Sequence, residues 1–379
     1  MTTTQDPKTG APVSFLDLVA DHAEVRDELD QAWDLVVSTG GFVGGAAVAE
    51  FEAAFAEYQQ GAFCVGVANG TDAIELILTG LGLGPGDDVI IPANTFIATA
   101  EAVAHTGANV VFADVDPGTL LITGATIDAA MTPNTKAVIA VHLYGQMVDM
   151  DDVGAAIERH CLMLVEDAAQ AHGAEWNGVR AGASSAAAAF SFYPGKNLGA
   201  LGDGGAIVTN DAELEERIRS MSNHGRSLSS RYEHDVLGRN SRLDSLQARA
   251  LLIKLGRLDD WNSNRRQAAQ WYRANLPEAI VPLEIRSEAV AVHHIGLVQV
   301  PVGERDNICA ALDAASIGWG IHYPVPCHEQ VAFQGADPVS MPVTEAAASR
   351  ILSLPMHPHL TEADVVRVCE VIRGCTAVA

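Results

Sequence analysis

The sequence predicts an α/β protein with a large domain, built on a mostly parallel seven-stranded sheet sandwiched by helices, and a smaller α+β C-terminal domain. Seven short apolar segments alternate with helical stretches, which is typical of a parallel sheet with helices on both faces. The chain has 379 residues, more than one core usually organises. After about residue 255 the alternation ends, so we expect a second domain there.

The large domain is expected to follow a mobile, polar tail over residues 1–12. Apolar residues at helical spacing over 21–39, ended by two glycines, predict a first helix, and others are expected over 47–58 and 71–81. Ligands bind such sheets at the carboxyl ends of the strands. The predicted strands are 64–70, 88–93, 109–115, 137–144, 162–169, 190–193 and 205–210.

The C-terminal part begins with a long amphipathic helix over 259–276, which we interpret as a connector. An apolar segment at 289–300 and helices near 305–315 and 362–373 indicate a smaller α+β unit. We therefore divide the chain into a tail (1–12), a large domain (13–255) and a small domain (256–379).

The charge balance is strongly acidic, with 23 Lys+Arg against 48 Asp+Glu and a formal net charge of -25. Such a field repels nucleic acids and anionic membranes, so neither is expected as a partner. An anionic substrate would need a local basic or dipolar pocket that acts against this field.

The cysteines and the N-terminus both favour a cytoplasmic protein. No cysteines form the close CxxC pairs of zinc or redox sites, so we expect buried thiols, a reducing compartment and no bound metal. The first residues lack a basic region followed by an apolar stretch, and no run approaches the roughly 20 apolar residues of a membrane helix. The cysteines are Cys64, Cys161, Cys309, Cys327, Cys369 and Cys375.

Three segments place reactive or polar residues at predicted strand ends. In the first, NGTDA (69–73), Gly70 permits a sharp turn from strand to helix, and the N–H groups of Thr71 and Asp72 open the helix. Backbone N–H groups in this position form an anion site. An ordinary capped helix start would use the same residues, so both interpretations stay open.

The second segment is VEDAAQAHG (165–173), in which an apolar strand carries Glu166 and Asp167 to its C-terminal end. A carboxylate in that place is costly unless it is paired. A pyridinium nitrogen is one suitable partner, because an adjacent carboxylate keeps it protonated. A helix cap or a magnesium ligand fits this segment equally well.

The third segment, FSFYPGKNLGALGDGG (190–205), is a strand that breaks at Pro194 and presents Lys196 in a Gly-rich loop with few charges. A lysine that must be neutral to attack a carbonyl benefits from such surroundings. The alternative is a solvated loop lysine, which the apolar and aromatic neighbours on both sides disfavour.

Together these segments resemble the sugar aminotransferases of the DegT/DnrJ/EryC1/StrS family, from about Leu16 to the C-terminus. The resemblance implies the pyridoxal phosphate (PLP) transferase fold of type I, as in aspartate aminotransferase. The segments that carry it are NGTDA (69–73), GDDVIIPANTFIATAEAV (86–103), VHLYGQMVDMD (141–151), VEDAAQAHGA (165–174), FSFYPGKNLGALGDGGA (190–206), NSRLDSLQA (240–248) and HYPVPCH (322–328).

The resemblance implies a role for individual residues around the cofactor. Lys196 matches the lysine that forms the Schiff base and then acts as general base and acid. Asp167 matches the carboxylate that bonds the pyridine nitrogen, and Gln170 matches the amide near the ring hydroxyl. Phe96 falls where the family places an aromatic ring against the cofactor.

For the cofactor phosphate the match indicates Gly70, Thr71 and Ser191, with Asn240 donated by a second subunit. A site completed across an interface requires a dimer, so a homodimer with shared active sites is expected. Without the resemblance, Asn240 would be interpreted as a turn residue before a helix.

The resemblance indicates Tyr193, His322 and Tyr323 as residues that line the substrate pocket. His322 is equally well explained as a structural histidine. His293 and His294 lie where relatives have a histidine followed closely by an aromatic residue. Here Ile295 and Gly296 follow, so this sequence departs from the family pattern.

The resemblance implies a PLP-dependent aminotransferase that moves an amino group from L-glutamate to a keto-deoxysugar nucleotide. NSRLDSLQA and FSFYPGKNLGALGDGG favour the 3-keto over the 4-keto position. A dTDP-linked sugar and antibiotic or other secondary-metabolite biosynthesis are expected on the same ground. A PLP-dependent sugar dehydratase is the enzymatic alternative, which carries His where this chain has Lys196, and a non-catalytic regulatory or binding protein is the other.

Overall fold

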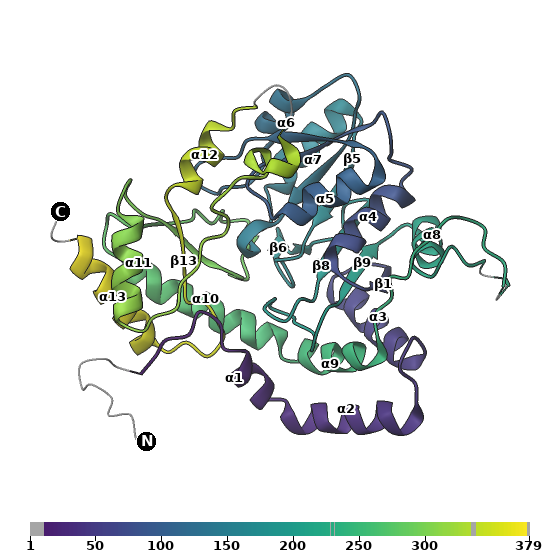
Figure 1. Ribbon diagram of the computed structural model, residues 1–379, viewed down its shortest axis with the longest axis horizontal. Helices are drawn as coiled ribbons and strands as arrows, with labels where there is room; N and C mark the ends of the chain where they lie inside the picture. The colour runs from purple at the N-terminus through teal and green to yellow at the C-terminus, as the bar shows by residue number, and fades with distance from the viewer. Residues whose placement is uncertain (1–10, 228, 231, 335–338, 377–379) are drawn as a thin grey trace.

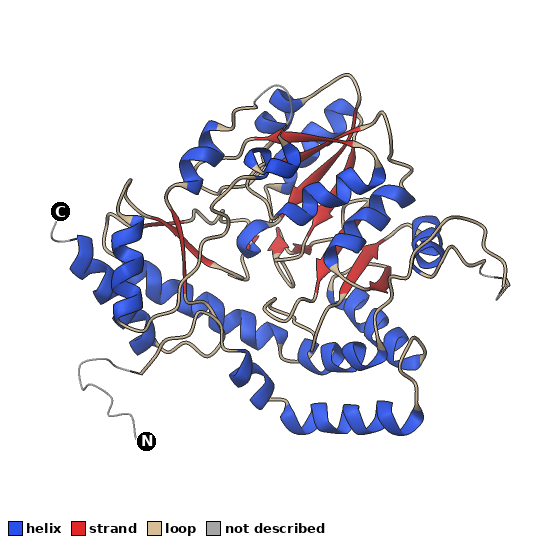
Figure 2. Ribbon diagram, viewed as in Figure 1, coloured by secondary structure: helices blue, strands red, loops and turns tan. Residues whose placement is uncertain are grey.

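A seven-stranded sheet forms the centre of the larger part of the molecule in the computed structural model (Figures 1 and 2). Strand β9 is antiparallel to both of its neighbours, and the other neighbouring pairs are parallel. The predicted mostly parallel sheet of seven strands is therefore confirmed. In spatial order the strands are β1 (Phe63–Val67), β9 (Gly205–Thr209), β8 (Ala187–Ser191), β5 (Met163–Asp167), β4 (Thr135–Val141), β2 (Asp88–Pro92) and β3 (Asn109–Ala113).

The structure describes residues 11–227, 229–230, 232–334 and 339–376. The first ten residues of the predicted tail lie outside this part of the chain.

Helices cover both faces of the sheet, and two apolar clusters fill the space between them (Figure 2). Residues of β8 alternate between the clusters: Ala187 and Ala189 lie in one, and Ala188 and Phe190 in the other. This alternation follows from the two-residue period of a strand. The helices of this part are α3 (Ala46–Tyr58), α4 (Gly70–Gly80), α5 (Ile97–Thr106), α6 (Gly124–Ala130), α7 (Met150–His160), α8 (Ala212–Ser222) and α9 (Ser245–Leu255).

The single helix expected over 21–39 is two helices, α1 (Leu18–Ala23) and α2 (Arg26–Thr39). The break lies at Val25, which is buried with 1% of its surface exposed. Its backbone is not helical, with φ of -120° and ψ of 18°, a break that helical periodicity does not reveal. Gly40 ends α2 in the left-handed conformation, as the two glycines predicted.

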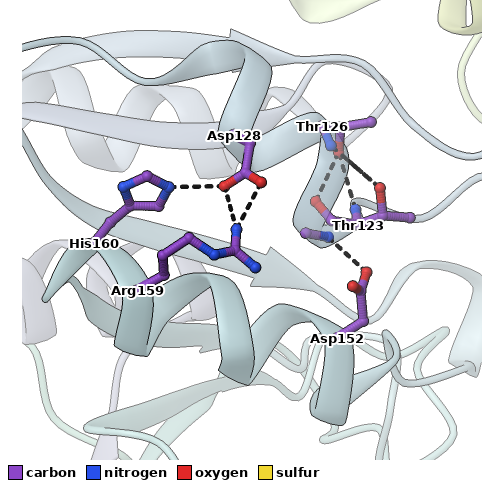
Figure 3. A network of polar contacts seen from close by, with 7 residues as sticks. Thr123, Thr126, Asp128, Asp152, Arg159 and His160 are labelled. Carbon is purple, nitrogen blue, oxygen red and sulfur yellow. Dashed lines mark hydrogen bonds and ion pairs between the residues drawn. The ribbon is translucent and has the colours of Figure 1, made fainter.

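Helices α6 and α7 are joined by polar contacts at both ends of α6 (Figure 3). A capping box of two threonines begins α6, and Asp152 of α7 accepts a hydrogen bond from the Gly124 N–H at 2.7 Å. At the other end, Asp128 pairs with Arg159 and His160 of α7. These contacts fix the outer layer over the β3 side of the sheet and lie apart from the strand ends discussed below.

The C-terminal part has its own apolar cluster around a three-stranded antiparallel sheet. Val13, assigned to the large domain from the sequence, packs in this cluster and bridges to Ile317. The proposed domain boundary at residue 255 falls between α9 and α10 and stays a prediction. The elements are α10 (Leu258–Asn275), β10 (Val281–Pro282), β12 (Gly296–Gln299), α11 (Arg305–Ala314), α12 (Pro342–Ala348), β13 (Ile351–Leu354) and α13 (Glu362–Thr376).

The apolar segment 289–300 is divided between two sheets. Its first residues form β11 (Ala289–Val290), which pairs with β6 (Glu175–Trp176) beside β7 (Val179–Arg180), and its last residues form β12. The residues between the two strands run past the strand ends of the large sheet. Three short 3-10 turns complete the fold, at Leu143–Gly145, Cys327–Glu329 and Val331–Phe333.

Two further expectations concern single features. In the described part of the chain, no helix has both the length and the apolar character needed to cross a bilayer. The expected burial of all six cysteines is wrong for two of them: Cys161 is exposed at the end of α7, and Cys375 is half-buried.

Candidate active site

A cavity of about 440 Å³ opens at the carboxyl ends of the large sheet, where the chain also contributes residues from its N-terminal and C-terminal parts. Every residue chosen from the sequence lines this cavity except Asn240. The lining residues among them are Gly70, Thr71, Phe96, Asp167, Gln170, Ser191, Tyr193, Lys196, His322 and Tyr323.

Asp167 ends β5 and is held from two sides. The Thr99 hydroxyl on α5 donates to one carboxylate oxygen at 2.7 Å, and the Ala169 N–H donates to the other at 3.1 Å. Thr99 in turn contacts the Thr95 hydroxyl at 2.8 Å. The carboxylate is thus fixed in orientation, and its remaining lone pairs can accept from an N–H donor in the cavity.

Glu166, the residue before Asp167, belongs to a buried pair with His142. The imidazole Nε2 lies 2.6 Å from one Glu166 oxygen, and the Gly182 N–H donates to the other at 3.0 Å. The Val148 N–H donates to His142 Nδ1 at 3.2 Å, so Nε2 carries the proton. Glu166 is therefore satisfied within the protein and is not a free carboxylate for a magnesium ion.

Lys196 lies in a tight loop that follows β8. Its N–H donates to the Tyr193 carbonyl at 2.8 Å, and Gly199 packs so closely on Pro194 that a side chain there would collide with the backbone. Removal from water lowers the pKa of the Lys196 amine to about 8, while the nearby Asp167 opposes this change. A neutral amine is thus accessible near physiological pH, which a solvated loop lysine would not provide.

The start of α4 faces Ser191 at the end of β8. Asn69 caps the helix by accepting from the Asp72 N–H at 2.8 Å, so the capped helix start is confirmed and this N–H is already paired. The anion-site interpretation of NGTDA stays a prediction. A Cβ on Gly70 would lie 2.8 Å from the Ser191 Cβ, so only glycine allows this close approach. Gly70, Thr71 and Ser191 all line the cavity.

Gln170 links the cavity to an unusual turn. Its oxygen accepts from the Tyr144 N–H at 2.6 Å, and its nitrogen donates to the Tyr323 hydroxyl at 3.2 Å. Tyr144 has a positive φ of 64° and donates from its hydroxyl to the His322 carbonyl at 2.8 Å. The Phe96 and Tyr323 rings lie 5.3 Å apart and form an aromatic wall.

His322 has both a structural partner and a place in the cavity. Its Nδ1 lies 2.8 Å from the Ser353 hydroxyl of β13, and its ring stacks on Phe15 at 5.7 Å. Burial, assisted by the positive charge of Lys196, lowers the pKa of His322 to about 4. His322 is therefore neutral near physiological pH.

Asn240 lies on the segment between α8 and α9, which extends away from the body of the molecule (Figure 1). The Arg242 Nε donates to its oxygen at 3.0 Å, and a bridge joins it to Asn223. Arg239 ties the same segment to α4 through an ion pair with Glu75. Asn240 is exposed and does not line the cavity of its own chain.

Sequence reasoning missed several lining residues. Phe15 and Leu16 come from the N-terminal segment that follows the predicted tail, and Thr99 lies one turn into α5. Asp203, of the GDGG sequence, and His294 also line the cavity. In the sequence, only the threonines of TFIATA (95–100) and the histidine pair at 293–294 could have indicated Thr99 and His294 as lining residues.

The donor set suits pyridoxal phosphate. The oriented Asp167 carboxylate is an acceptor for a pyridinium N–H, and the helix start with Ser191 offers donors to a phosphate. Gly70 lets the helix start lie directly against Ser191, because a Cβ at this position would be only 2.8 Å from the Ser191 Cβ. Among the described lining residues, Lys196 is the one lysine or arginine.

Comparison with known proteins gives a match over nearly the whole chain. The model of the DegT/DnrJ/EryC1/StrS aminotransferase family matches residues 23–373. The erythromycin biosynthesis sensory transduction protein EryC1 of Saccharopolyspora erythraea is 46% identical over 92% of this chain and 95% of its own length. The dTDP-3-amino-3,4,6-trideoxy-alpha-D-glucose transaminase of Streptomyces venezuelae is 44% identical, over 95% of each chain.

The fold is also found among solved structures. The crystal structure of S. venezuelae DesV in complex with a ketimine intermediate is 43% identical and has a TM-score of 0.93. The match covers 96% of this chain and 98% of that chain, so it includes both the large sheet and the C-terminal part.

Proposed function

The chain belongs to the DegT/DnrJ/EryC1/StrS aminotransferase family, and on this premise we propose that it transfers the amino group of L-glutamate to a keto-deoxysugar nucleotide with pyridoxal 5'-phosphate as cofactor. The observation that carries the proposal is the placement of two groups in one cavity. Asp167 and Lys196 follow the neighbouring parallel strands β5 and β8 and line the same space.

The cofactor, when bound, supplies an aldehyde and a ring that accepts electrons. In the proposed reaction Asp167 keeps a ring nitrogen protonated, and Thr99 holds the carboxylate in place. Lys196 Nζ would accept a proton from one carbon and deliver it to the carbon on the other side of the transferred nitrogen, a 1,3-proton shift for which a pKa of about 8 is suited. Gln170, whose oxygen accepts from the Tyr144 N–H, takes no part in proton transfer and would orient the cofactor ring near its hydroxyl.

The proposed substrate is a dTDP-linked sugar with a keto group at C3. Similarity to a transaminase named for a dTDP-3-amino sugar supports this choice, at 44% identity. The proposed setting is amino sugar biosynthesis for an antibiotic or another secondary metabolite, and the proposed compartment is the cytoplasm.

We also propose a homodimer in which Asn240 of one subunit contributes to the phosphate site of the other. Asn240 is exposed, and its oxygen is engaged by Arg242, so its NH₂ group is the part left to donate to an anion. Exposed apolar side chains on α2 and the segment after it support a contact with a second copy. They are Trp33, Leu35, Val37, Phe42 and Val43.

Mixing two inactive variants tests the shared site. Lys196→Ala and Asn240→Ala are each expected to be inactive, but a mixed dimer has one site with an intact Lys196 and an intact Asn240. After denaturation and refolding together, about a quarter of the wild-type activity should return. No recovery in mixtures whose mixed dimers are verified by mass would contradict a shared site.

Product analysis tests the reaction itself. The protein is incubated with L-glutamate and a panel of 3-keto and 4-keto deoxysugar nucleotides, and the products are identified by mass spectrometry and NMR. Amine formed at C3 is expected, with none from Lys196→Ala. Release of a keto-deoxysugar without amine would indicate the dehydratase, and a bound cofactor whose spectrum does not respond to glutamate would indicate the regulatory protein.

A further inference from the structure

A series of buried hydrogen bonds ends at the cavity wall beside Lys196. Asn262 donates to the His172 carbonyl at 2.9 Å, and its oxygen accepts from the Asn197 NH₂ at 2.8 Å. The same NH₂ donates to the Val292 carbonyl at 2.9 Å. The Asn197 oxygen lies 3.0 Å from His294 Nδ1. The three side chains that form the series are buried, with 2 to 8% of their surface exposed.

The direction of these bonds determines which nitrogen of His294 carries hydrogen. Backbone carbonyls accept and never donate, so the NH₂ groups of both asparagines must face them. The Asn197 oxygen is then the atom that faces His294, and only a hydrogen on Nδ1 can complete that bond. A neutral His294 therefore has a lone pair and no hydrogen on Nε2.

The surroundings of His294 keep the ring neutral. Burial lowers the pKa of His294 well below its ordinary value, and the positive charges of Lys196 and Arg265 act in the same direction. Near physiological pH the ring does not take up a second proton, so Nε2 remains an acceptor.

His294 also faces the space where the substrate must lie. It lines the cavity together with Asp167 and Lys196, and Asn197, which orients it, directly follows Lys196 in the chain. Because Nδ1 is occupied, Nε2 is the nitrogen that remains for a ligand in the cavity.

We propose that His294 Nε2 accepts a hydrogen bond from a hydroxyl group of the sugar, and thereby fixes how the sugar lies against Lys196. A hydroxyl can donate to this lone pair, whereas a phosphate or a carboxylate has no hydrogen to give and is repelled. The sugar should therefore lie against the part of the cavity wall that His294 forms, and the anionic groups of a substrate should lie in another part of the cavity. This inference rests on the proposed function and adds a residue that determines specificity.

Two substitutions separate the two nitrogens of His294. In His294→Asn the amide nitrogen takes the place of Nδ1, so the bond to Asn197 is kept and the acceptor is lost. In His294→Gln the amide reaches the place of Nε2, so an acceptor oxygen is kept and the bond to Asn197 is lost. The enzyme is used with the cofactor in its amine form, and the binding of dTDP-glucose and of dTDP is measured by calorimetry.

His294→Asn should weaken dTDP-glucose binding by about threefold to tenfold, the range for one neutral hydrogen bond, and leave dTDP binding unchanged. His294→Gln should bind dTDP-glucose more tightly than His294→Asn. Four analogues of dTDP-glucose each lack one sugar hydroxyl. One of them should bind the wild type as weakly as dTDP-glucose binds His294→Asn. This analogue should bind His294→Asn no more weakly than dTDP-glucose does. Equal affinity of wild type and His294→Asn, or strictly additive losses for every analogue, would overturn the proposal.

A nitrogen NMR measurement tests the proton assignment without any turnover. With ¹⁵N-labelled histidine, His294 in the wild type should show hydrogen on Nδ1 and none on Nε2, and Asn197→Leu should abolish this preference. Hydrogen on Nε2 in the wild type would overturn the proposal even if the variants folded poorly. If an attached sugar does not increase the affinity of the wild type over that for dTDP, the proposed function and the inference both fail. If the sugar increases the affinity of the wild type and of His294→Asn equally, only the inference fails.

Discussion

Asp167 and Glu166 are adjacent on β5, yet their carboxylates are held by different parts of the protein. Asp167 accepts from Thr99 and borders the cavity, whereas Glu166 accepts from His142 and from the Gly182 N–H and has no exposed surface. Successive side chains of a strand point to opposite faces, which explains how neighbours meet such different partners. The two carboxylates should therefore differ sharply in what their loss affects.

Asp167→Asn is expected to reduce turnover by about 10² to 10³-fold, because a neutral amide cannot hold a ring nitrogen in its protonated form. The Asn side chain keeps an oxygen for the Thr99 hydroxyl, but its NH₂ group then faces the Ala169 N–H, so the melting temperature should also fall. Steady-state kinetics and a thermal scan of the same preparation measure the two effects. An Asp167→Asn enzyme with wild-type kcat would remove the assigned role.

Glu166→Gln is expected to reduce the free energy of unfolding by about 1–3 kcal/mol, with a smaller effect on turnover than Asp167→Asn. Glutamine has one oxygen, but two N–H donors face this position, from His142 and Gly182. The NH₂ group must therefore face one of them. Reversal of the His142 tautomer would only move the conflict to the Val148 N–H.

Urea denaturation measures the effect of Glu166→Gln, and Glu175→Gln is a matched control. Glu175 pairs with Arg180 at 3.2 Å in a partly exposed position, where such pairs contribute about 0–1 kcal/mol. An equal loss of unfolding free energy in the two variants would show that the buried Glu166 pair stabilises the protein no more than the partly exposed Glu175 pair does.

The location of the cavity could be predicted because each motif combines an apolar strand with polar residues at its end. Parallel strands bring such ends to one edge of the sheet, so Asp167 and Ser191 were expected to lie near Gly70. The order of the strands and the antiparallel direction of β9 were not predictable from periodicity, since hydrophobic alternation does not record which strands pair.

The missed residues depend on contacts between distant parts of the chain. Phe15 reaches the cavity because Val13 bridges to Ile317, and nothing in the local sequence connects these segments. His294 was noticed as a departure from the family pattern, but its role depends on the amide of Asn197. The break between α1 and α2 was also missed, because apolar residues keep their helical spacing through Val25 although its backbone is not helical.

The contribution of Lys196 to the stability of the cofactor-free protein should rise between about pH 8 and pH 10.5. The pKa of Lys196 is lowered to about 8 in the folded protein from an ordinary value of 10.5. Between these values Lys196 carries a proton in the unfolded chain but not in the folded protein, so its contribution to stability increases with pH. Below pH 8 both states are protonated, and the full cost of burying the charge remains.

Urea denaturation at several pH values checks this dependence. The slope of stability against pH should be less positive in Lys196→Met than in the wild type. Lys254, whose pKa is also lowered to about 8 by burial, contributes to the slope of both proteins. Lys136→Met, at an exposed position, should keep the wild-type slope. A Lys196→Met protein with the wild-type slope would show that the amine is not deprotonated in this range.

Lys254→Met should disturb the loop of Lys196 from a distance. The buried Lys254 amine on α9 donates to the Gly199 carbonyl at 2.7 Å and lies 3.0 Å from His22 Nε2. Methionine keeps the volume but leaves both groups without a donor, at a cost of about 1–3 kcal/mol for a buried acceptor. Because Gly199 closes the turn that begins at Pro194, a looser turn would admit water to Lys196.

A more hydrated Lys196 amine should have a pKa closer to 10.5, because less of its solvation is lost. The rate at which the cofactor-free protein takes up pyridoxal phosphate should then reach its plateau at a higher pH in Lys254→Met than in the wild type. A purely global loss of stability would lower the amount of folded protein without moving this midpoint. An unchanged midpoint, in a variant that remains folded at every pH tested, would show that the bond from Lys254 to Gly199 does not position Lys196.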